Sequence, residues 1–241
     1  MFLLLISPAV GSFLGVLADR LSRGEDVVQQ PSACRDCGHR LGLRDLVPLG
    51  SYLWQRGNCR HCAAPIPMRL FLIEASAVLC TVWAGIVTVT PVQMGVAALY
   101  LWVLLGLAAA DAQWFRLPDL LTGPLALLGL ALAWEDPSRG LMDGLIGAAI
   151  AVLAFAVLRR TYKALRGREG LGLGDVKLMA GIGAGVGAMN VPLVVLVAAG
   201  SALCWVLLQA AVQGQRLQRE TALPFGMFLS LATVGVWLWL A

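Results

Sequence analysis

Five acidic residues lie within or beside long apolar stretches of this 241-residue chain: Glu74, Asp111, Asp119, Asp143 and Asp175. A carboxylate at the edge of a membrane span is energetically costly, so such a residue is a candidate for function. Two carboxyl groups at close range cannot both ionise easily and therefore share a proton. One can then act as a base toward water, while the other donates to a carbonyl oxygen or a leaving amine. This is the chemistry of an aspartyl protease.

Asp111 and Asp175 are the best candidates for such a pair. Asp111 ends one apolar stretch, and Asp175 follows Gly172-Leu173-Gly174 at the start of another. Because Gly172 and Gly174 have no side chains, an extended substrate backbone could approach the acid there. We therefore expect Asp111 and Asp175 to meet in the folded chain.

Each acid also has a purely structural interpretation. Asp119 could cap the helix that it begins, and Asp175 could do the same for its own helix. Glu74 could pair with Arg69 at the membrane edge, and Asp143 fits the start of a helix on the far side. Spacing alone leaves capping and catalysis open.

The composition predicts an all-α membrane protein. The chain is 59% hydrophobic and 13% charged, whereas a soluble domain carries roughly 25% charge. A membrane span needs about 20 apolar residues, and about eight transmembrane helices are expected, near residues 1–17, 70–90, 95–112, 120–134, 144–158, 176–188, 191–212 and 223–240. The first is expected to be a retained helix rather than a signal peptide, because no charge precedes it and Asp19 and Arg20 follow it.

The basic residues predict the orientation of these helices. With eight spans, every Lys and Arg except Arg139 falls on one side of the membrane. Positive-inside bias makes that side cytoplasmic and places both termini outside. Asp111, Asp119 and Asp175 then lie at the cytoplasmic ends of their helices. The net charge of +4 reflects this topology and attraction to anionic lipid, and it is not a sign of nucleic-acid binding.

Two Cys-x-x-Cys knuckles lie in the polar loop between the first two predicted helices, at Cys34, Cys37, Cys59 and Cys62. Four thiolates at this spacing predict a tetrahedral site for zinc or a similar metal, and a closed ligand shell indicates a structural role. His39 or His61 could replace a ligand, although both fit ordinary loop residues. The alternative, two disulfides, would need an oxidising compartment, whereas the charge pattern places this loop in the cytoplasm.

Three regions follow from these patterns. Residues 1–19 are expected to form the first transmembrane helix, and residues 20–69 a small cytoplasmic, zinc-ribbon-like four-Cys domain. Residues 70–241 are expected to form a seven-helix membrane core.

The order of motifs along the chain resembles the prepilin peptidase family, also called type IV leader peptidases, which are membrane aspartyl proteases with a Gly-x-Gly-Asp motif. The resemblance rests on Gly11-Ser12-Phe13-Leu14, the two knuckles, the segment from Arg69 to Glu74, Asp111 with Leu117-Pro118-Asp119, Gly172-Leu173-Gly174-Asp175-Val176-Lys177, and Pro224-Phe225-Gly226. The proline that usually follows the last motif in this family is replaced here by Met227.

The resemblance implies an endopeptidase of the bacterial inner membrane. Its substrates would be precursors of type IV pilins or type II secretion pseudopilins, cut after a Gly at the cytoplasmic face. Many members also methylate the new N-terminus with S-adenosylmethionine. The implied partners are precursor helices and membrane lipid, without nucleic acid. The implied catalytic pair is Asp111 and Asp175, and the supporting residues are Asp119, Gly172, Gly174, Lys177 and Glu74.

Two other functions fit parts of the pattern. A presenilin-like intramembrane protease shares Gly-x-Gly-Asp, but the four-Cys loop and Leu117-Pro118-Asp119 argue against it. A transporter could use membrane acids to bind ions, but transporters often show internal repeats and broken midplane helices. Here no clear repeat is visible, and the acids are predicted at one interface.

Overall fold

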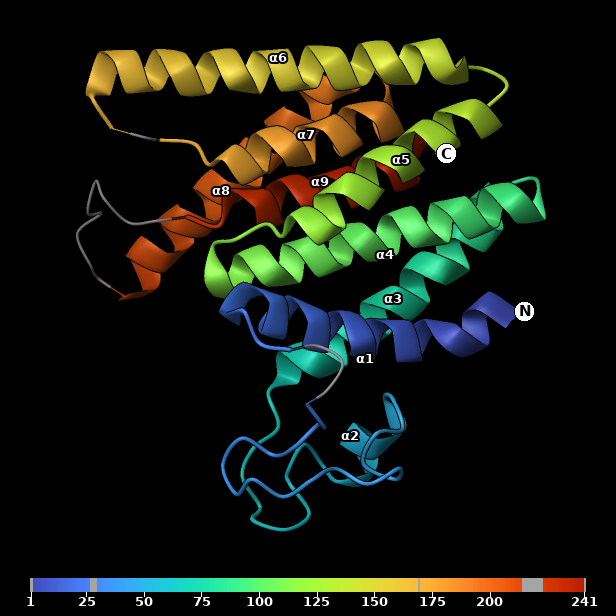
Figure 1. The fold of residues 1–241 in the computed structure, drawn as a ribbon, viewed down its shortest axis with the longest axis vertical. Helices are drawn as coiled ribbons and strands as arrows, with labels where there is room; N and C mark the ends of the chain where they lie inside the picture. The colour runs from blue at the N-terminus through green and yellow to red at the C-terminus, as the bar shows by residue number, and fades with distance from the viewer. Residues whose placement is uncertain (1, 27–29, 169, 214–222, 241) are drawn as a thin grey trace.

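The computed structural model describes residues 2–26, 30–168, 170–213 and 223–240. In these residues the regular secondary structure is helical, apart from two isolated β-bridges in the four-Cys loop, which confirms the all-α prediction. The long helices are α1 (Phe2–Arg23), α3 (Met68–Val87), α4 (Pro91–Trp114), α5 (Asp119–Glu135), α6 (Gly140–Arg166), α7 (Leu173–Val186), α8 (Val191–Gln213) and α9 (Phe225–Leu240), and the one-turn helix α2 (Gly50–Trp54) lies in the loop (Figure 1). Arg216 and Arg219, counted above on the basic side, lie outside the described residues.

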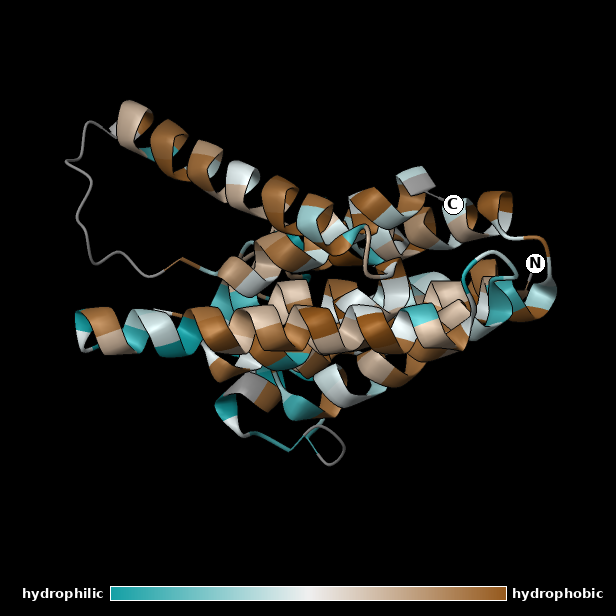
Figure 2. Ribbon diagram, turned by 90° about the horizontal axis from the view of Figure 1, so that it is seen from above, coloured by the Kyte–Doolittle hydropathy of each residue, from teal (hydrophilic) through white to brown (hydrophobic). Residues whose placement is uncertain are grey.

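Five of the described helices, α1, α3, α4, α6 and α8, are long and apolar enough to cross a membrane. α9 is apolar but shorter, and α5 and α7 have 17 and 14 residues. Figure 2 shows hydrophobic residues along most of the helices and a hydrophilic end on α6. Hydropathy placed that helix near 144–158, whereas α6 runs over Gly140–Arg166. The helix continues because Lys and Arg are good helix formers even where lipid ends.

The short helix α7 is packed closely between α5 and α6. Glycines line this contact: a Cβ on Gly129 would lie 2.7 Å from the carbonyl oxygen of Gly181, and one on Gly183 would clash with Gly147. These glycines therefore serve backbone approach between helices. Close packing fixes the position of α7, and with it Asp175 in its first turn.

Arg139, the exception to the charge asymmetry, holds the far end of α7. Its guanidinium donates to the carbonyl oxygens of Gly185 at 2.7 Å and Ala184 at 3.1 Å. The same group pairs with Asp143 at 3.0 Å. These bonds satisfy carbonyl groups that every helix leaves unpaired in its last turn.

Candidate active site and metal centre

Asp111 and Asp175 line one cavity of about 500 Å³. The wall comes from the end of α1, the link between α4 and α5, and the start of α7 (Figure 1). The lining residues of the cavity are Leu21, Asp111, Phe115, Arg116, Leu117, Pro118, Asp119, Gly172, Leu173, Gly174 and Asp175. Two acids from distant parts of the sequence thus face the same space.

The start of α9 holds the Asp111 carboxyl group. The Met227 N–H donates to Asp111 Oδ2 at 2.8 Å, and proline at this position could not donate. A Cβ on Gly226 would lie 3.1 Å from the same oxygen and 2.9 Å from Leu117 Cδ1. The Pro224-Phe225-Gly226 motif therefore brings backbone against a buried acid. No local sequence pattern connects this turn with Asp111.

Asp175 combines a capping role with its place in the cavity. Its Oδ2 accepts the Gly172 N–H at 3.2 Å, across the first turn of α7. A side chain on Gly172 would lie 3.2 Å from that oxygen. A Cβ on Gly174 would lie 3.0 Å from the Leu117 Cβ, so this glycine lets α7 approach the α4–α5 link. The missing side chain of Gly172 thus leaves Asp175 open to the cavity, and that of Gly174 lets α7 lie close to Leu117.

Asp119 pairs with Lys177 across the two helices that begin at the cavity. The Lys177 Nζ lies 2.6 and 2.7 Å from the two Asp119 carboxylate oxygens. The helix α5 has no side-chain cap, and its N-cap residue is Pro118. The capping interpretation of Asp119 is therefore wrong. The pair joins α5 to α7 and neutralises a cation beside the two acids.

Glu74 lies outside the residues that line the cavity. It is 8% exposed, and its Oε2 accepts the backbone N–H of Leu49 at 2.7 Å. In the part of the chain that the structure describes, no ion pair joins Glu74 to Arg69. The acid instead holds the four-Cys loop against α3.

The four cysteines of the knuckles converge. Their Sγ atoms all lie within 4.8 Å of one another, and those of Cys34 and Cys62 are 3.8 Å apart. Tetrahedral zinc with Zn–S bonds of about 2.3 Å requires S···S separations of about 3.8 Å. The cysteines are free thiols, so the disulfide alternative is not realised. The donor set fits a structural metal ion such as zinc.

The two knuckles have the same backbone design. Gly38 and Ala63 each follow a knuckle with left-handed φ of 69° and 58°. The N–H groups of Cys62 and His61 lower the pKa of the Cys59 thiol to about 7, whereas burial and the neighbouring thiols, against the N–H of Ala64, raise the pKa of the Cys62 thiol to about 12. The rings of His39 and His61 stack with centroids 3.5 Å apart, and neither belongs to the four-Cys cluster.

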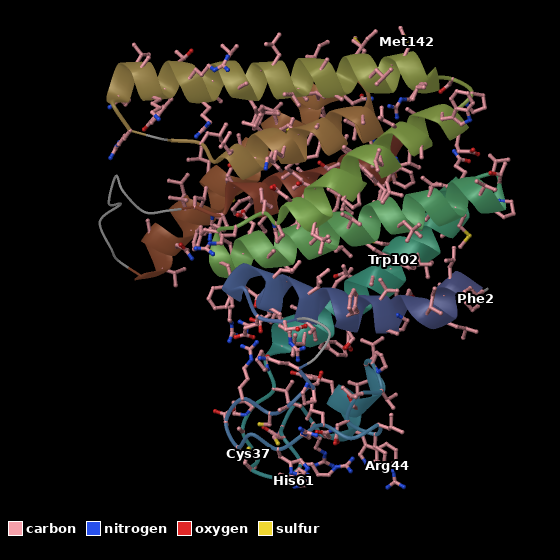
Figure 3. The ribbon with its side chains drawn as sticks, viewed as in Figure 1. Phe2, Cys37, Arg44, His61, Trp102 and Met142 are labelled. Atoms are coloured by element: carbon pink, nitrogen blue, oxygen red, sulfur yellow. The ribbon has the colours of Figure 1, made fainter. Side chains whose placement is uncertain are left out.

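Asp19 attaches the four-Cys loop to α1. This buried carboxylate pairs with Arg35, inside the first knuckle, and with Arg23 at 2.9 Å. Arg23 in turn lies 4.9 Å over the Trp114 ring at the end of α4. Figure 3 shows Cys37 and His61 at the end of the loop remote from α1. From the sequence Asp19 served only as a helix boundary, because Arg35, its partner in the four-Cys loop, stands 16 residues away.

This fold and cavity define a class: multi-pass helical membrane proteins with two carboxyl groups in one cavity and a four-Cys cluster. The chain matches the family models "Bacterial Peptidase A24 N-terminal domain" over residues 5–88 and "Type IV leader peptidase family" over residues 98–207. The chain belongs to the type IV leader peptidase family. This confirms the resemblance seen in the sequence.

Three relatives show the extent of the similarity, and each is named "Prepilin leader peptidase/N-methyltransferase". The protein of Dickeya chrysanthemi is 34% identical over 91% of this chain and 77% of its own length. That of Aeromonas hydrophila is 34% identical over 98% of this chain and 89% of its own length. That of Burkholderia pseudomallei strain K96243 is 41% identical over 83% of this chain and 64% of its own length. No solved structure matches the chain with significance.

Proposed function

We propose that this chain is an aspartic endopeptidase that removes the leader from prepilins or pseudopilins and N-methylates the new N-terminus. The observation that carries the proposal is the shared cavity of Asp111 and Asp175. The names of the relatives supply the substrate class and the second reaction. Glu74, a supporting residue by resemblance, acts at a distance through the four-Cys loop, whereas Asp119 and Lys177 act beside the cavity.

In the proposed reaction one acid is ionised and the other protonated, because two charges cannot be sustained at close range. The ionised carboxylate removes a proton from water, and the resulting hydroxide forms a bond to the scissile carbonyl carbon. The protonated acid donates to the carbonyl oxygen. The carboxyl group that took the proton from water passes it to the leaving amine as the C–N bond of the tetrahedral intermediate breaks, and the other carboxylate takes the proton of one diol hydroxyl as the carbonyl re-forms. The macroscopic titration belongs to the pair rather than to either acid.

The hydrogen bonds around the pair support this assignment. The Met227 N–H fixes one oxygen of Asp111, and the Gly172 N–H fixes one oxygen of Asp175. Such preorganised orientation is worth a large part of a catalytic barrier.

We place the chain in the bacterial inner membrane, with both termini external and the cavity at the cytoplasmic face. The distribution of Lys and Arg supports this orientation. A precursor with a basic leader and an apolar helix keeps the leader cytoplasmic, so its scissile bond lies at the interface where Asp111 and Asp175 are found. Residues 1–19 and 70–241 form the membrane part in this proposal, and residues 20–69 the four-Cys domain.

Zinc is the proposed metal, and Cys34, Cys37, Cys59 and Cys62 are its ligands. Their role is structural, because four thiolates complete a tetrahedral shell. S-adenosylmethionine is the proposed methyl donor for the second reaction, which the names of the relatives support.

A model prepilin incubated with the purified protein tests the proposal. Mass measurement of the product's N-terminus, with and without S-adenosylmethionine, reports both reactions. We expect cleavage to be lost in Asp111→Asn and Asp175→Asn and retained in Asp136→Asn, whose carboxylate bonds Ser138 in a loop away from the cavity. Undiminished cleavage by both cavity variants would contradict the proposal. Cleavage without the added mass of one methyl group would contradict the proposed N-methylation and leave the proposed cleavage standing.

A further inference from the structure

The four-Cys loop contains an uncharged stretch, residues 46–54, that neither the peptidase site nor the metal site uses. It reads Leu-Val-Pro-Leu-Gly-Ser-Tyr-Leu-Trp, between Asp45 and Gln55-Arg56. Trp54 is 88% exposed and Leu53 65% exposed. The exposed large apolar side chains of residues 46–54 are those of Leu46, Val47, Leu53 and Trp54. An apolar cluster of this kind on a small polar domain indicates a contact surface.

This stretch is attached to the first two turns of α3. The Leu49 N–H donates to Glu74 Oε2 at 2.7 Å, and the rings of Tyr52 and Phe71 lie 5.0 Å apart. Figure 1 shows α2 below α1 and apart from it, level with the middle of that helix rather than beyond its C-terminal end. The exposed side chains therefore stand at the depth at which α3 begins.

The length of α3 fixes that depth relative to lipid. The helix has 20 residues, which at about 1.5 Å per residue span about 30 Å. The hydrocarbon core of a bilayer is also about 30 Å thick. An α3 that crosses the bilayer therefore has no spare turn to extend into water, and Phe71 and Glu74, in its first two turns, would lie inside the boundary. Leu49 and Tyr52, which contact these two residues, would then lie in the same leaflet.

Several backbone N–H groups of the stretch are hydrogen-bonded within the protein. Besides the Leu49 N–H, those of Gly50, Ser51 and Leu53 bond to carbonyl oxygens of Pro48, Val47 and Leu49, respectively. Lipid tolerates only backbone whose polar groups are satisfied within the protein. Glu74 supplies the acceptor for the Leu49 N–H.

We propose that residues 46–54 form a membrane-inserted anchor, with Leu46, Val47, Leu53 and Trp54 in the acyl-chain boundary of the leaflet next to the four-Cys domain. Tryptophan favours this boundary. Arg44 and Arg56, on either side of the stretch, are long enough to reach the headgroups. The buried Glu74 is the residue that positions the anchor. This inference depends on membrane insertion of α3 and is independent of the peptidase assignment.

Fluorescence quenching in lipid vesicles tests the anchor. The full protein is reconstituted in phosphatidylcholine–phosphatidylglycerol vesicles, with or without brominated acyl chains, and the spectrum of Trp54→Phe is subtracted from that of the wild type. Two further difference spectra, obtained in the same way from other tryptophan variants, serve as controls. Trp83→Phe reports a half-exposed tryptophan of α3, and Trp102→Phe reports one that is 2% exposed within the bundle.

We expect the Trp54 signal to lose intensity in brominated vesicles as the Trp83 signal does, and to be shielded from aqueous acrylamide. The Trp102 signal should respond to neither quencher. A Trp54 signal quenched by acrylamide and untouched by brominated lipid would place the stretch in water and overturn the proposal. A signal protected from both would show a protein contact and overturn it equally. Glu74→Leu should increase acrylamide access to Trp54, whereas Glu74→Gln, which keeps an acceptor oxygen, should change it little.

Discussion

Replacing Gly226 by alanine places a methyl group against one of the two proposed catalytic acids. The added Cβ lies 3.1 Å from Asp111 Oδ2, 3.2 Å from Asp111 Cγ and 2.9 Å from Leu117 Cδ1. Leu117 can turn its terminal methyl away, but the carboxyl group must move by a few tenths of an ångström. A misplacement of about 1 Å costs about 10²-fold in rate, so a shift of this size predicts a loss of about 4- to 10-fold in kcat/KM.

Gly235→Ala on the same helix is the matched control, because its added Cβ meets no atom within 4 Å. Alanine in place of glycine favours a helix by roughly 0.5–1 kcal/mol, so neither variant should unfold more easily than the wild type. Cleavage of a model prepilin and thermal unfolding are measured for both. Full activity in a folded Gly226→Ala variant would refute the view that the start of α9 sets the position of Asp111.

Three further changes have expected outcomes. Ala63→Gly should slow the loss of metal to a chelator and stabilise the four-Cys domain by about 1 kcal/mol, because it relieves a side chain in the left-handed region; faster metal loss would count against this. Arg139→Gln should lower the stability of the bundle by about 1–3 kcal/mol in thermal unfolding, because the carbonyl group of Gly185 loses its donor; an unchanged melting temperature would contradict it. Met227→Pro should remove the N–H donor to Asp111 and lower kcat, while the fold persists because proline is tolerated in the first turn; an unchanged kcat would show that this hydrogen bond has no catalytic effect.

The sequence was sufficient to predict the features that depend on local pattern. The Cys-x-x-Cys spacing predicted a four-thiol cluster, and the asymmetry of Lys and Arg predicted that Asp111 and Asp175 lie at one depth, with which their shared cavity agrees. Helix ends were predicted less well. Hydropathy indicates which part of a helix lipid surrounds. It therefore does not predict the last two turns of α6, which are basic.

The contacts that complete the site were beyond sequence reasoning, because they join positions distant along the chain. The Met227 N–H and Asp111 are 116 residues apart, and Glu74 finds its partner 25 residues away in a backbone N–H that has no residue-type signature. Asp119 was ambiguous for a related reason: a helix-start acid has the same local sequence whether it caps the helix or pairs with Lys177.

The central claim, that Asp111 and Asp175 act as one proton-sharing unit, is tested most directly by residual single-turnover cleavage rates in a double-mutant cycle. The rates of Asp111→Asn, Asp175→Asn and the double variant are compared on the same precursor. Each single change should lower the rate by about 10³-fold or more, and the double variant should be no slower than either, because groups that work as a unit are lost together. Losses that multiply, or near-normal cleavage by either single variant, would contradict it.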